Sequence, residues 1–200
     1  MRKIVVFTMV SLDGVMQAPG GPEEDASDGF KYGGWTVPYA DESFGPIFKK
    51  ELSVPFDLLL GRKTYEIFAA YWPKQKGMVA DPFNKAKKYV ASDKGLDLTW
   101  KESILINGNA AAKLKTLKKE DGPVFHVWGS SNLIQTLLKN DLVDELRLRI
   151  YPVTLASGKR LFAEGTIPAA FELLDSTALP SGVILANYKR SGEIKTGSFA

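Results

Sequence analysis

Leu58-Leu59-Leu60-Gly61-Arg62-Lys63-Thr64 is an apolar, strand-like run that ends in a turn and passes directly into a helix-like pattern. Val127-Trp128-Gly129-Ser130-Ser131-Asn132 repeats this arrangement, and Tyr89-Val90-Ala91-Ser92 is a third strand-like run that ends at a small polar residue. Such turns bind anions, because the first N–H groups of a helix lack internal partners and the helix dipole adds positive charge there. The three segments predict that anionic groups bind at one edge of an α/β sheet.

Strand and helix patterns alternate along the chain. Strands are predicted at 2–10, 56–61, 87–92, 103–106, 123–129, 143–153, 170–176 and 182–190. Helices are predicted at 42–52, 65–71, 110–120 and 131–139. Several strands are nearly continuous apolar runs, as burial on both faces requires, so we expect a mostly parallel central sheet. The last two strands have no helix between them and predict an antiparallel C-terminal edge, with 182–190 as the edge strand.

Composition limits the possible function classes. The chain has 200 residues, with 26 basic and 23 acidic side chains, no Cys and one His. Disulfides, thiolate nucleophiles and cysteine or multi-histidine metal sites are therefore excluded, and the balanced, dispersed charge argues against nucleic-acid binding. The N-terminal apolar run is short and lacks a cleavage pattern, and no run is long enough to span a bilayer. We expect a cytoplasmic protein with no metal, membrane or nucleic-acid partner.

The chain length predicts one domain over residues 1–190, followed by a C-terminal tail at 191–200. Residues 17–40 form a Gly- and Pro-rich stretch that also contains Phe30, Tyr32 and Trp35. A long loop in a compact domain is usually functional or disordered, and its aromatic residues favour an active-site lid.

The first turn has the residues that a phosphate group needs. Gly61 lets the backbone approach a ligand closely, Arg62 offers a planar fork of donors, and Lys63 offers a mobile charge. Thr64 either caps the following helix or bonds a phosphate oxygen. In the alternative interpretation, both cations are only solvated.

The other two turns are weaker signals when taken singly. Ser92 either contacts a 2′-phosphate or an adenine, or it is an ordinary turn hydroxyl. Gly129-Ser130-Ser131-Asn132 lacks the full dinucleotide fingerprint, so it either admits a pyrophosphate or is an ordinary Ser-capped helix start. The occurrence of all three turns at the ends of successive strands favours a phosphorylated dinucleotide.

Several other polar residues are open to two interpretations. Asp41 and Glu42 either act on a substrate ring or are helix N-terminal acids favoured by the dipole. The Arg149 side chain faces solvent, a partner subunit or an anionic substrate. His126 lies in an apolar run and is interpreted as a core residue, and Asp13 fits an ordinary turn before Gly.

A series of motifs carries a family resemblance. Ser11-Leu12-Asp13-Gly14 follows the first strand, and Leu60-Gly61-Arg62-Lys63-Thr64-Tyr65-Glu66 follows the second. Further along come Asp144-Glu145-Leu146-Arg147-Leu148, Tyr151-Pro152-Val153 and Gly158-Lys159-Arg160-Leu161-Phe162. In this order they resemble the dihydrofolate reductase-like superfamily, and most closely the C-terminal reductase domain of the bifunctional riboflavin-biosynthesis deaminase–reductase and its free-standing relatives.

The resemblance implies a three-layer α/β/α fold that binds NADPH in an extended form. Hydride would pass to a pterin- or pyrimidine-like heterocycle, as in 5-amino-6-(5-phosphoribosylamino)uracil reductase of riboflavin biosynthesis. One departure is Gly129-Ser130, which stands where the family has Gly-Gly. The cofactor-binding residues implied are Met9, Asp13, Gly61, Arg62, Lys63, Thr64, Ser92, Trp128, Gly129, Ser130, Ser131, Asn132 and Leu133.

On the substrate side, Phe44 and Phe48 are expected to form an apolar slot, with Asp41 or Glu42 as the acid that orients or protonates the ring. Arg149 or Lys159 would supply the second anion site that a phosphoribosyl substrate needs.

The family commonly pairs subunits, and the apolar segments 143–153 and 154–162 predict a homodimer. Three alternatives remain open: a nucleotide-binding module without turnover, a true dihydrofolate reductase, and a dimeric stress or resistance protein with a vestigial cleft.

Overall fold

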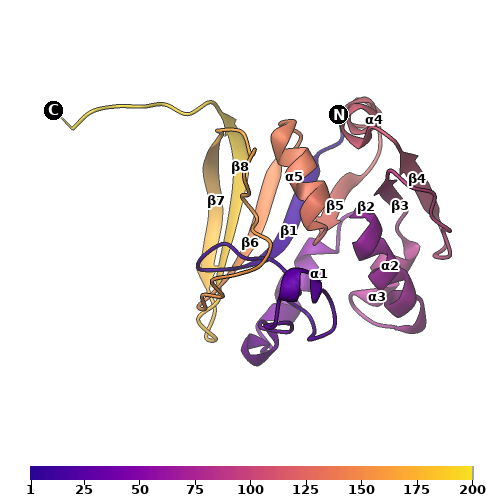
Figure 1. Cartoon of the computed structure of the whole chain (residues 1–200), viewed down its shortest axis with the longest axis horizontal. Helices are drawn as coiled ribbons and strands as arrows, with labels where there is room; N and C mark the ends of the chain where they lie inside the picture. Colours follow the sequence, from indigo (N-terminus) through magenta and orange to yellow (C-terminus); the bar gives the residue numbers. More distant parts are fainter. Residues whose placement is uncertain (200) are drawn as a thin grey trace.

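The computed structural model describes residues 1–199, and within them eight strands form one sheet in the order β4-β3-β2-β5-β1-β6-β8-β7. Figure 1 shows this order from β7 at the left to β4 at the right. The strands are β1 Ile4–Ser11, β2 Phe56–Gly61, β3 Lys88–Ser92, β4 Ser103–Asn107, β5 Val124–Trp128, β6 Glu145–Tyr151, β7 Ala170–Ala178 and β8 Ile184–Gly192. The α-helices are α1 Phe44–Glu51, α2 Arg62–Tyr71, α3 Ala80–Lys85, α4 Ala110–Leu117 and α5 Ser131–Lys139. Short 3-10 turns are η1 Ser27–Gly29, η2 Val37–Tyr39 and η3 Trp72–Lys74.

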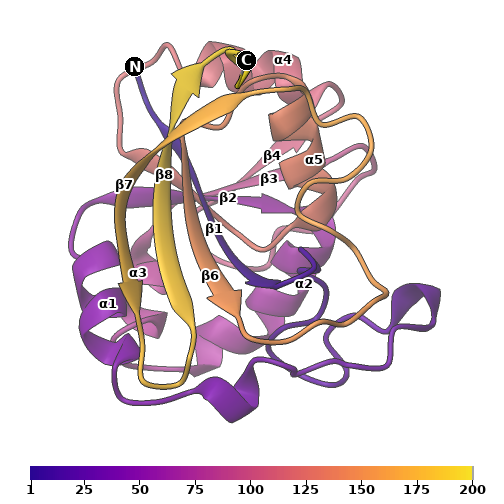
Figure 2. The ribbon, with the colours of Figure 1, turned by 90° about the vertical axis from the view of Figure 1, so that its left-hand side faces the viewer.

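Strand pairing confirms a mostly parallel sheet with an antiparallel C-terminal edge. β1 pairs in parallel with β5 and β6, β2 with β3 and β5, and β3 with β4. β8 runs antiparallel to both β6 and β7. The expectation that 182–190 form the edge strand itself was wrong, because β8 lies inside the sheet and β7 is outermost (Figure 2).

Helices cover both faces of the sheet, which confirms the three-layer arrangement. Leu58 and Leu60 of β2 pack in one cluster with residues of α2 and α3, whereas Leu59 packs in another with residues of α4 and α5. All three side chains are fully buried. Since successive side chains of a strand point to opposite faces, the apolar run in β2 is explained by burial on both sides.

Local differences from the sequence-based expectations occur at helix starts. α2 begins at Arg62, so Thr64 lies in its first turn and does not cap it. α3 was not predicted, because it is only six residues long and contains Pro82. Asn109 caps α4 as expected, with its side-chain oxygen accepting from Ala112 N at 3.0 Å. No helix within residues 1–199 is long and apolar enough to cross a membrane.

The loop at 17–40 packs on the body of the protein around the buried Gln17. The Gln17 side chain donates to the backbone oxygens of Asp25 and Ser27, at 3.0 Å each, and accepts from Lys159 N at 2.9 Å. Trp35, also buried, donates its indole N–H to the Gln17 carbonyl at 2.8 Å. These bonds fix the position of the loop, because a buried amide that lost its partners would be costly.

The homodimer remains a prediction, and the structure changes the argument for it. β6 lies between β1 and β8 of the same chain, and its Leu146 and Leu148 are buried in the core, so these apolar side chains need no partner subunit. Phe162, in the adjoining segment, is 51% exposed. We expect light scattering at tens of micromolar, roughly where a standard interface is occupied, to show a dimer that Phe162→Glu weakens. A monomer under these conditions would contradict the prediction.

Candidate active site

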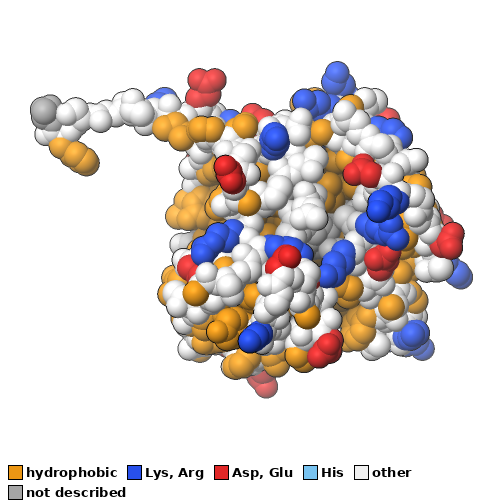
Figure 3. Space-filling model, in the orientation of Figure 1, with side chains coloured by type: hydrophobic (Ala, Val, Ile, Leu, Met, Phe, Trp, Pro, Cys, Tyr) orange, Lys and Arg blue, Asp and Glu red, His pale blue; other side chains and the backbone are white. Residues whose placement is uncertain are grey.

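A cleft of about 1220 Å³ opens where the parallel strands β1, β2, β3 and β5 end. Figure 3 shows this face of the molecule, where basic and acidic side chains are interspersed around a hollow. The three predicted turns converge on the cleft, as the carboxyl ends of neighbouring parallel strands must. The sequence-predicted residues that line it are Met9, Phe48, Gly61, Arg62, Lys63, Thr64, Ser92, Trp128, Gly129, Ser130, Ser131, Asn132, Leu133, Arg149 and Lys159.

The third turn has an unusual backbone conformation. Gly129 and Ser130 have φ values of +65° and +68°, so both lie in the left-handed region. For a non-glycine residue this conformation costs about 1–2 kcal/mol. Ser130 Oγ accepts a hydrogen bond from Gly61 N at 2.9 Å. This bond joins the first turn to the third and gives the Ser130 hydroxyl a structural role.

Two helices begin at the cleft without a side-chain cap. α2 follows Gly61 and α5 follows Ser130, and neither of these N-cap residues bonds its own helix through a side chain. The Ser130 hydroxyl instead accepts a hydrogen bond from Gly61 N. α4, by contrast, is capped by Asn109. The uncapped N–H groups of α2 and α5 and the dipoles behind them favour an anion between the two helix ends.

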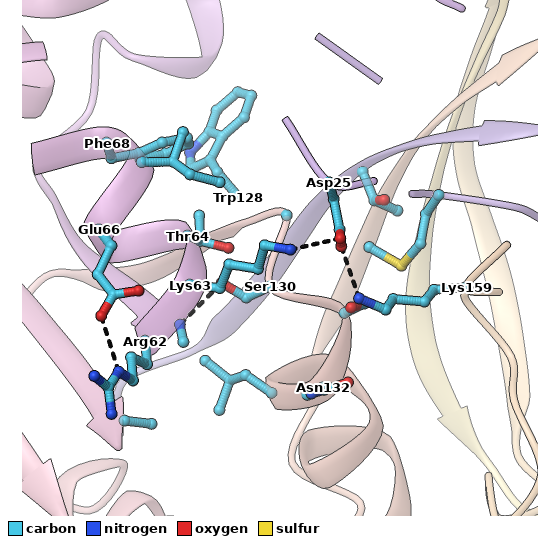
Figure 4. Close-up of a pocket in the computed structure, with 18 of the residues that line it drawn as sticks. Asp25, Arg62, Lys63, Thr64, Glu66, Phe68, Trp128, Ser130, Asn132 and Lys159 are labelled. Atoms are coloured by element: carbon cyan, nitrogen blue, oxygen red, sulfur yellow. Dashed lines mark hydrogen bonds and ion pairs between the residues drawn. The ribbon is translucent and has the colours of Figure 1, made fainter. Parts of the chain in front are cut away.

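Basic side chains of the cleft are paired with carboxylates (Figure 4). Arg62 Nε lies 2.9 Å from Glu66 on the exposed side of α2. Lys63 and Lys159 both contact Asp25, at 2.5 and 2.7 Å. Burial alone would raise the pKa of the Asp25 carboxyl, but the hydrogen bonds from Lys159 and Lys63 outweigh it and hold that pKa well below its usual range.

An aromatic slot adjoins this charged part of the cleft. Phe7 and Trp128 stack with their ring centroids 4.4 Å apart, and Phe48 lies 6.1 Å from Trp128. The Arg149 guanidinium lies 5.2 Å from the Phe48 ring centre and 5.3 Å from that of Trp128. Such a slot suits a flat ring, because aromatic faces and a planar cation both stack on it.

Arg149 itself is only 2% exposed and donates to the Glu51 carboxylate on α1. Its Nε has no hydrogen-bond partner among the residues that the structure describes. Burial raises the pKa of Glu51, and the charge of Arg149 opposes that rise. A buried N–H without a partner is rare. Among the described residues, the indole N–H groups of Trp72 and Trp128, which also line the cleft, are unpartnered as well.

Four expected site residues do not line the cleft. Asp41 and Glu42 are exposed, and Asp41 accepts from Ser43 N at 2.8 Å. Phe44 packs in a separate cluster with Trp35. Asp13 accepts from Leu155 N and Ala156 N at 3.1 and 2.9 Å, so it joins two loops beside the cleft. The geometry gives no support to Asp41 or Glu42 as the acid, because both precede α1 on its solvent side.

Ser92 lines the cleft, and its contacts also fit the alternative interpretation of an ordinary turn hydroxyl. Its hydroxyl donates to the Lys94 carbonyl at 2.7 Å, as a turn hydroxyl does.

Glu24 and Asp25 line the cleft but were missed in the sequence analysis, although both lie in the predicted lid at 17–40. Burial raises the pKa of Glu24, and hydrogen bonds from Gly20 and Gly21 offset only part of that rise.

His126 lies outside the cleft, as expected of a core residue. It is buried between Phe7 and Phe56, with ring centroids 4.5 and 4.4 Å away. Burial lowers its pKa to about 3, so the imidazole is neutral at pH 7.

Comparison with known proteins finds one matching family model, similar sequences and similar solved structures. Residues 2–185 match the model of the RibD C-terminal domain. The uncharacterized protein YyaP of Bacillus subtilis is 28% identical over 196 residues, which cover 96% of each chain. A crystal structure of a putative riboflavin biosynthesis protein from Shewanella sp. PV-4 has a TM-score of 0.66 at 20% identity, covering 94% of this chain and 99% of that chain. Dihydrofolate reductase from Enterococcus faecalis complexed with NADP(H) has a TM-score of 0.59 at 16% identity, covering 94% and 96%.

The Ser130 turn can be tested with two matched variants. Ser130→Ala loses the bond to Gly61 N but keeps the left-handed strain, whereas Ser130→Gly loses the same bond and relieves the strain. We therefore expect Ser130→Ala to be less stable than Ser130→Gly by about 1 kcal/mol, measured by urea unfolding. Equal stabilities would show that the turn is not strained.

Proposed function

The chain belongs to the RibD C-terminal domain family, and we propose that it is an NADPH-dependent reductase of a pterin- or pyrimidine-like heterocycle. The family and the dihydrofolate reductase-like fold support a reductase of the RibD type. The observation that carries the proposal is the pair of uncapped helix ends, at Arg62 and Ser131, that face one cleft beside an aromatic slot.

The residues present fit a phosphorylated dinucleotide. Backbone N–H groups at the starts of α2 and α5 would hold its pyrophosphate, because both helix ends are uncapped. Arg62 is exposed, and its bond to Glu66 is a surface ion pair of low strength, so the guanidinium can turn to a 2′-phosphate. Ser92 would lie near the adenosine end. Bound NADPH supplies the hydride.

The substrate ring would pack against Phe48 and Trp128, which line one wall of the cleft, next to the Arg149 guanidinium. This placement orients the ring and excludes water. Hydride addition to a C=N bond also needs a proton at nitrogen. Glu24 is the cleft carboxyl whose pKa is raised by burial, so it retains a proton more readily than Asp25 and replaces Asp41 and Glu42 as the candidate acid.

Cofactor choice tests the role of Arg62. A charge-assisted hydrogen bond contributes about 1.5–3 kcal/mol, so NADPH should bind on the order of tenfold or more tighter than NADH. Arg62→Ala should narrow this gap by weakening NADPH alone, with NADH as the control ligand that lacks the phosphate. Fluorescence titration measures both affinities. Equal affinity of the wild-type protein for the two cofactors would refute the proposal for Arg62.

Turnover tests the reaction and the acid together. We expect slow NADPH oxidation with aminopyrimidine or dihydropterin compounds and weak or no activity on dihydrofolate. Glu24→Gln should lower kcat about 100-fold with unchanged NADPH affinity, and the rate should fall as the pH rises through the raised pKa of Glu24, because the acid must be protonated. Glu23→Gln, an exposed neighbour, is the matched control.

If NADPH binds but is never consumed with any such compound, the protein is a nucleotide-binding module and the reductase proposal fails. If turnover persists undiminished in Glu24→Gln, the acid lies elsewhere.

A further inference from the structure

Lys63 and Lys159 reach the cleft from opposite sides of it. Lys63 lies in the first turn of α2, and Lys159 lies in the segment after β6. Two ammonium groups that converge in this way are a typical cradle for a phosphate substituent. In this protein, however, a carboxylate from the loop at 17–40 lies between them (Figure 4).

Asp25 uses both of its oxygens in that position. Oδ1 accepts from Lys63 Nζ at 2.5 Å and from the Ser27 hydroxyl at 2.6 Å. Oδ2 accepts from Lys159 Nζ at 2.7 Å. Two ammonium groups and a hydroxyl are the donors that a phosphate group would need, so the protein satisfies them with its own carboxylate.

The position of Asp25 is built into the fold. Its backbone oxygen accepts from the buried Gln17 side chain, and the Gln17 side-chain oxygen accepts from Lys159 N. Gln17 therefore fixes both partners of the Asp25–Lys159 pair at once. The Asp25 side chain is only 13% exposed, which distinguishes this pair from a mobile surface contact.

Arg149, the other cation of the substrate side, is also neutralised. Its guanidinium donates to Glu51, so the pair carries no net charge. What remains is the buried Nε–H, which has no partner within residues 1–199 and belongs to a side chain that lines the cleft. A single N–H in a neutral pair suits a carbonyl oxygen of a ring better than a phosphate dianion.

We propose that the substrate is an uncharged oxo-heterocycle without a phosphate group, whose ring carbonyl accepts from Arg149 Nε while Asp25 fills the Lys63–Lys159 cradle. This inference rests on the proposed reductase function and narrows its substrate class. It departs from the phosphoribosylated pyrimidine that the family resemblance implies. A phosphate here would have to displace Asp25 or lie against its negative charge.

The test uses uridine and uridine 5′-monophosphate, two probes that share the pyrimidine ring carbonyls and ribose and differ in the phosphate. Binding to the full chain is measured by ligand-observed NMR titration with saturating NADP⁺, so that the nucleotide site is filled. Asp25→Asn removes the negative charge and frees the two lysines. Asp28→Asn is the matched control, because Asp28 is an exposed acid of the same loop that does not line the cleft.

We expect the wild-type protein to prefer uridine to its monophosphate. Asp25→Asn should strengthen binding of the monophosphate on the order of tenfold, since it gains charge-assisted hydrogen bonds. Uridine affinity should change little, and Asp28→Asn should alter neither. Arg149→Lys, which keeps the charge but loses Nε–H, should weaken the binding of uridine.

Several results would overturn the proposal. They are tighter binding of the monophosphate by the wild-type protein, no selective gain in Asp25→Asn, and no binding of either probe. A gain of NADP⁺ affinity in Asp25→Asn in place of monophosphate affinity would show that the lysines serve the cofactor. A separate assay of NADPH binding and of NADPH oxidation distinguishes these failures from failure of the reductase proposal, in which NADPH does not bind or binds but is never consumed.

Discussion

Parallel pairing of β5 with both β2 and β1 is the constraint on which the site depends. In this arrangement Leu58 lies opposite His126, and Phe7 lies opposite Trp128. The strands therefore end side by side, and the turns after β2 and β5 meet close enough for Gly61 N to bond Ser130 Oγ. Without this register, the starts of α2 and α5 would not face one cleft. The apolar runs that bury both sheet faces thus also position the anion-binding turns.

Much of this could be predicted from sequence, because the signals are local. The run at 58–60 indicates a doubly buried strand, and the small residues at 129–131 indicate a turn into a helix. The failures have a physical reason too. Asp41 precedes the start of α1 at Phe44, whereas Phe48, which does reach the cleft, lies about one turn inside the helix. A periodic pattern identifies the helix but not which end approaches the ligand.

The charged pairs of the cleft could not be predicted, because they join residues far apart in the sequence. Asp25 meets Lys159 across 134 positions, and Glu51 meets Arg149 across 98. Neither pair leaves a periodic trace, since each depends on how a loop or helix end packs on the finished sheet. Either Lys159 or Arg149 was expected to bind an anion. In the folded chain each already has a carboxylate, and that changes what the substrate side can accept.

This pairing resolves an electrostatic difficulty of the proposed function. A cleft with enough free cations for a phosphorylated dinucleotide would bind anions along its whole length and discriminate poorly. Backbone N–H groups at two helix ends attract phosphate without a mobile charge, and they act only within the first turn. Glu51 can then neutralise Arg149 beside the aromatic rings, and Asp25 can neutralise Lys159, while the helix ends keep their backbone N–H groups. On the proposed function, the cleft thus has an anion-binding part, made of backbone N–H groups and Arg62, and a neutral part that binds the substrate ring.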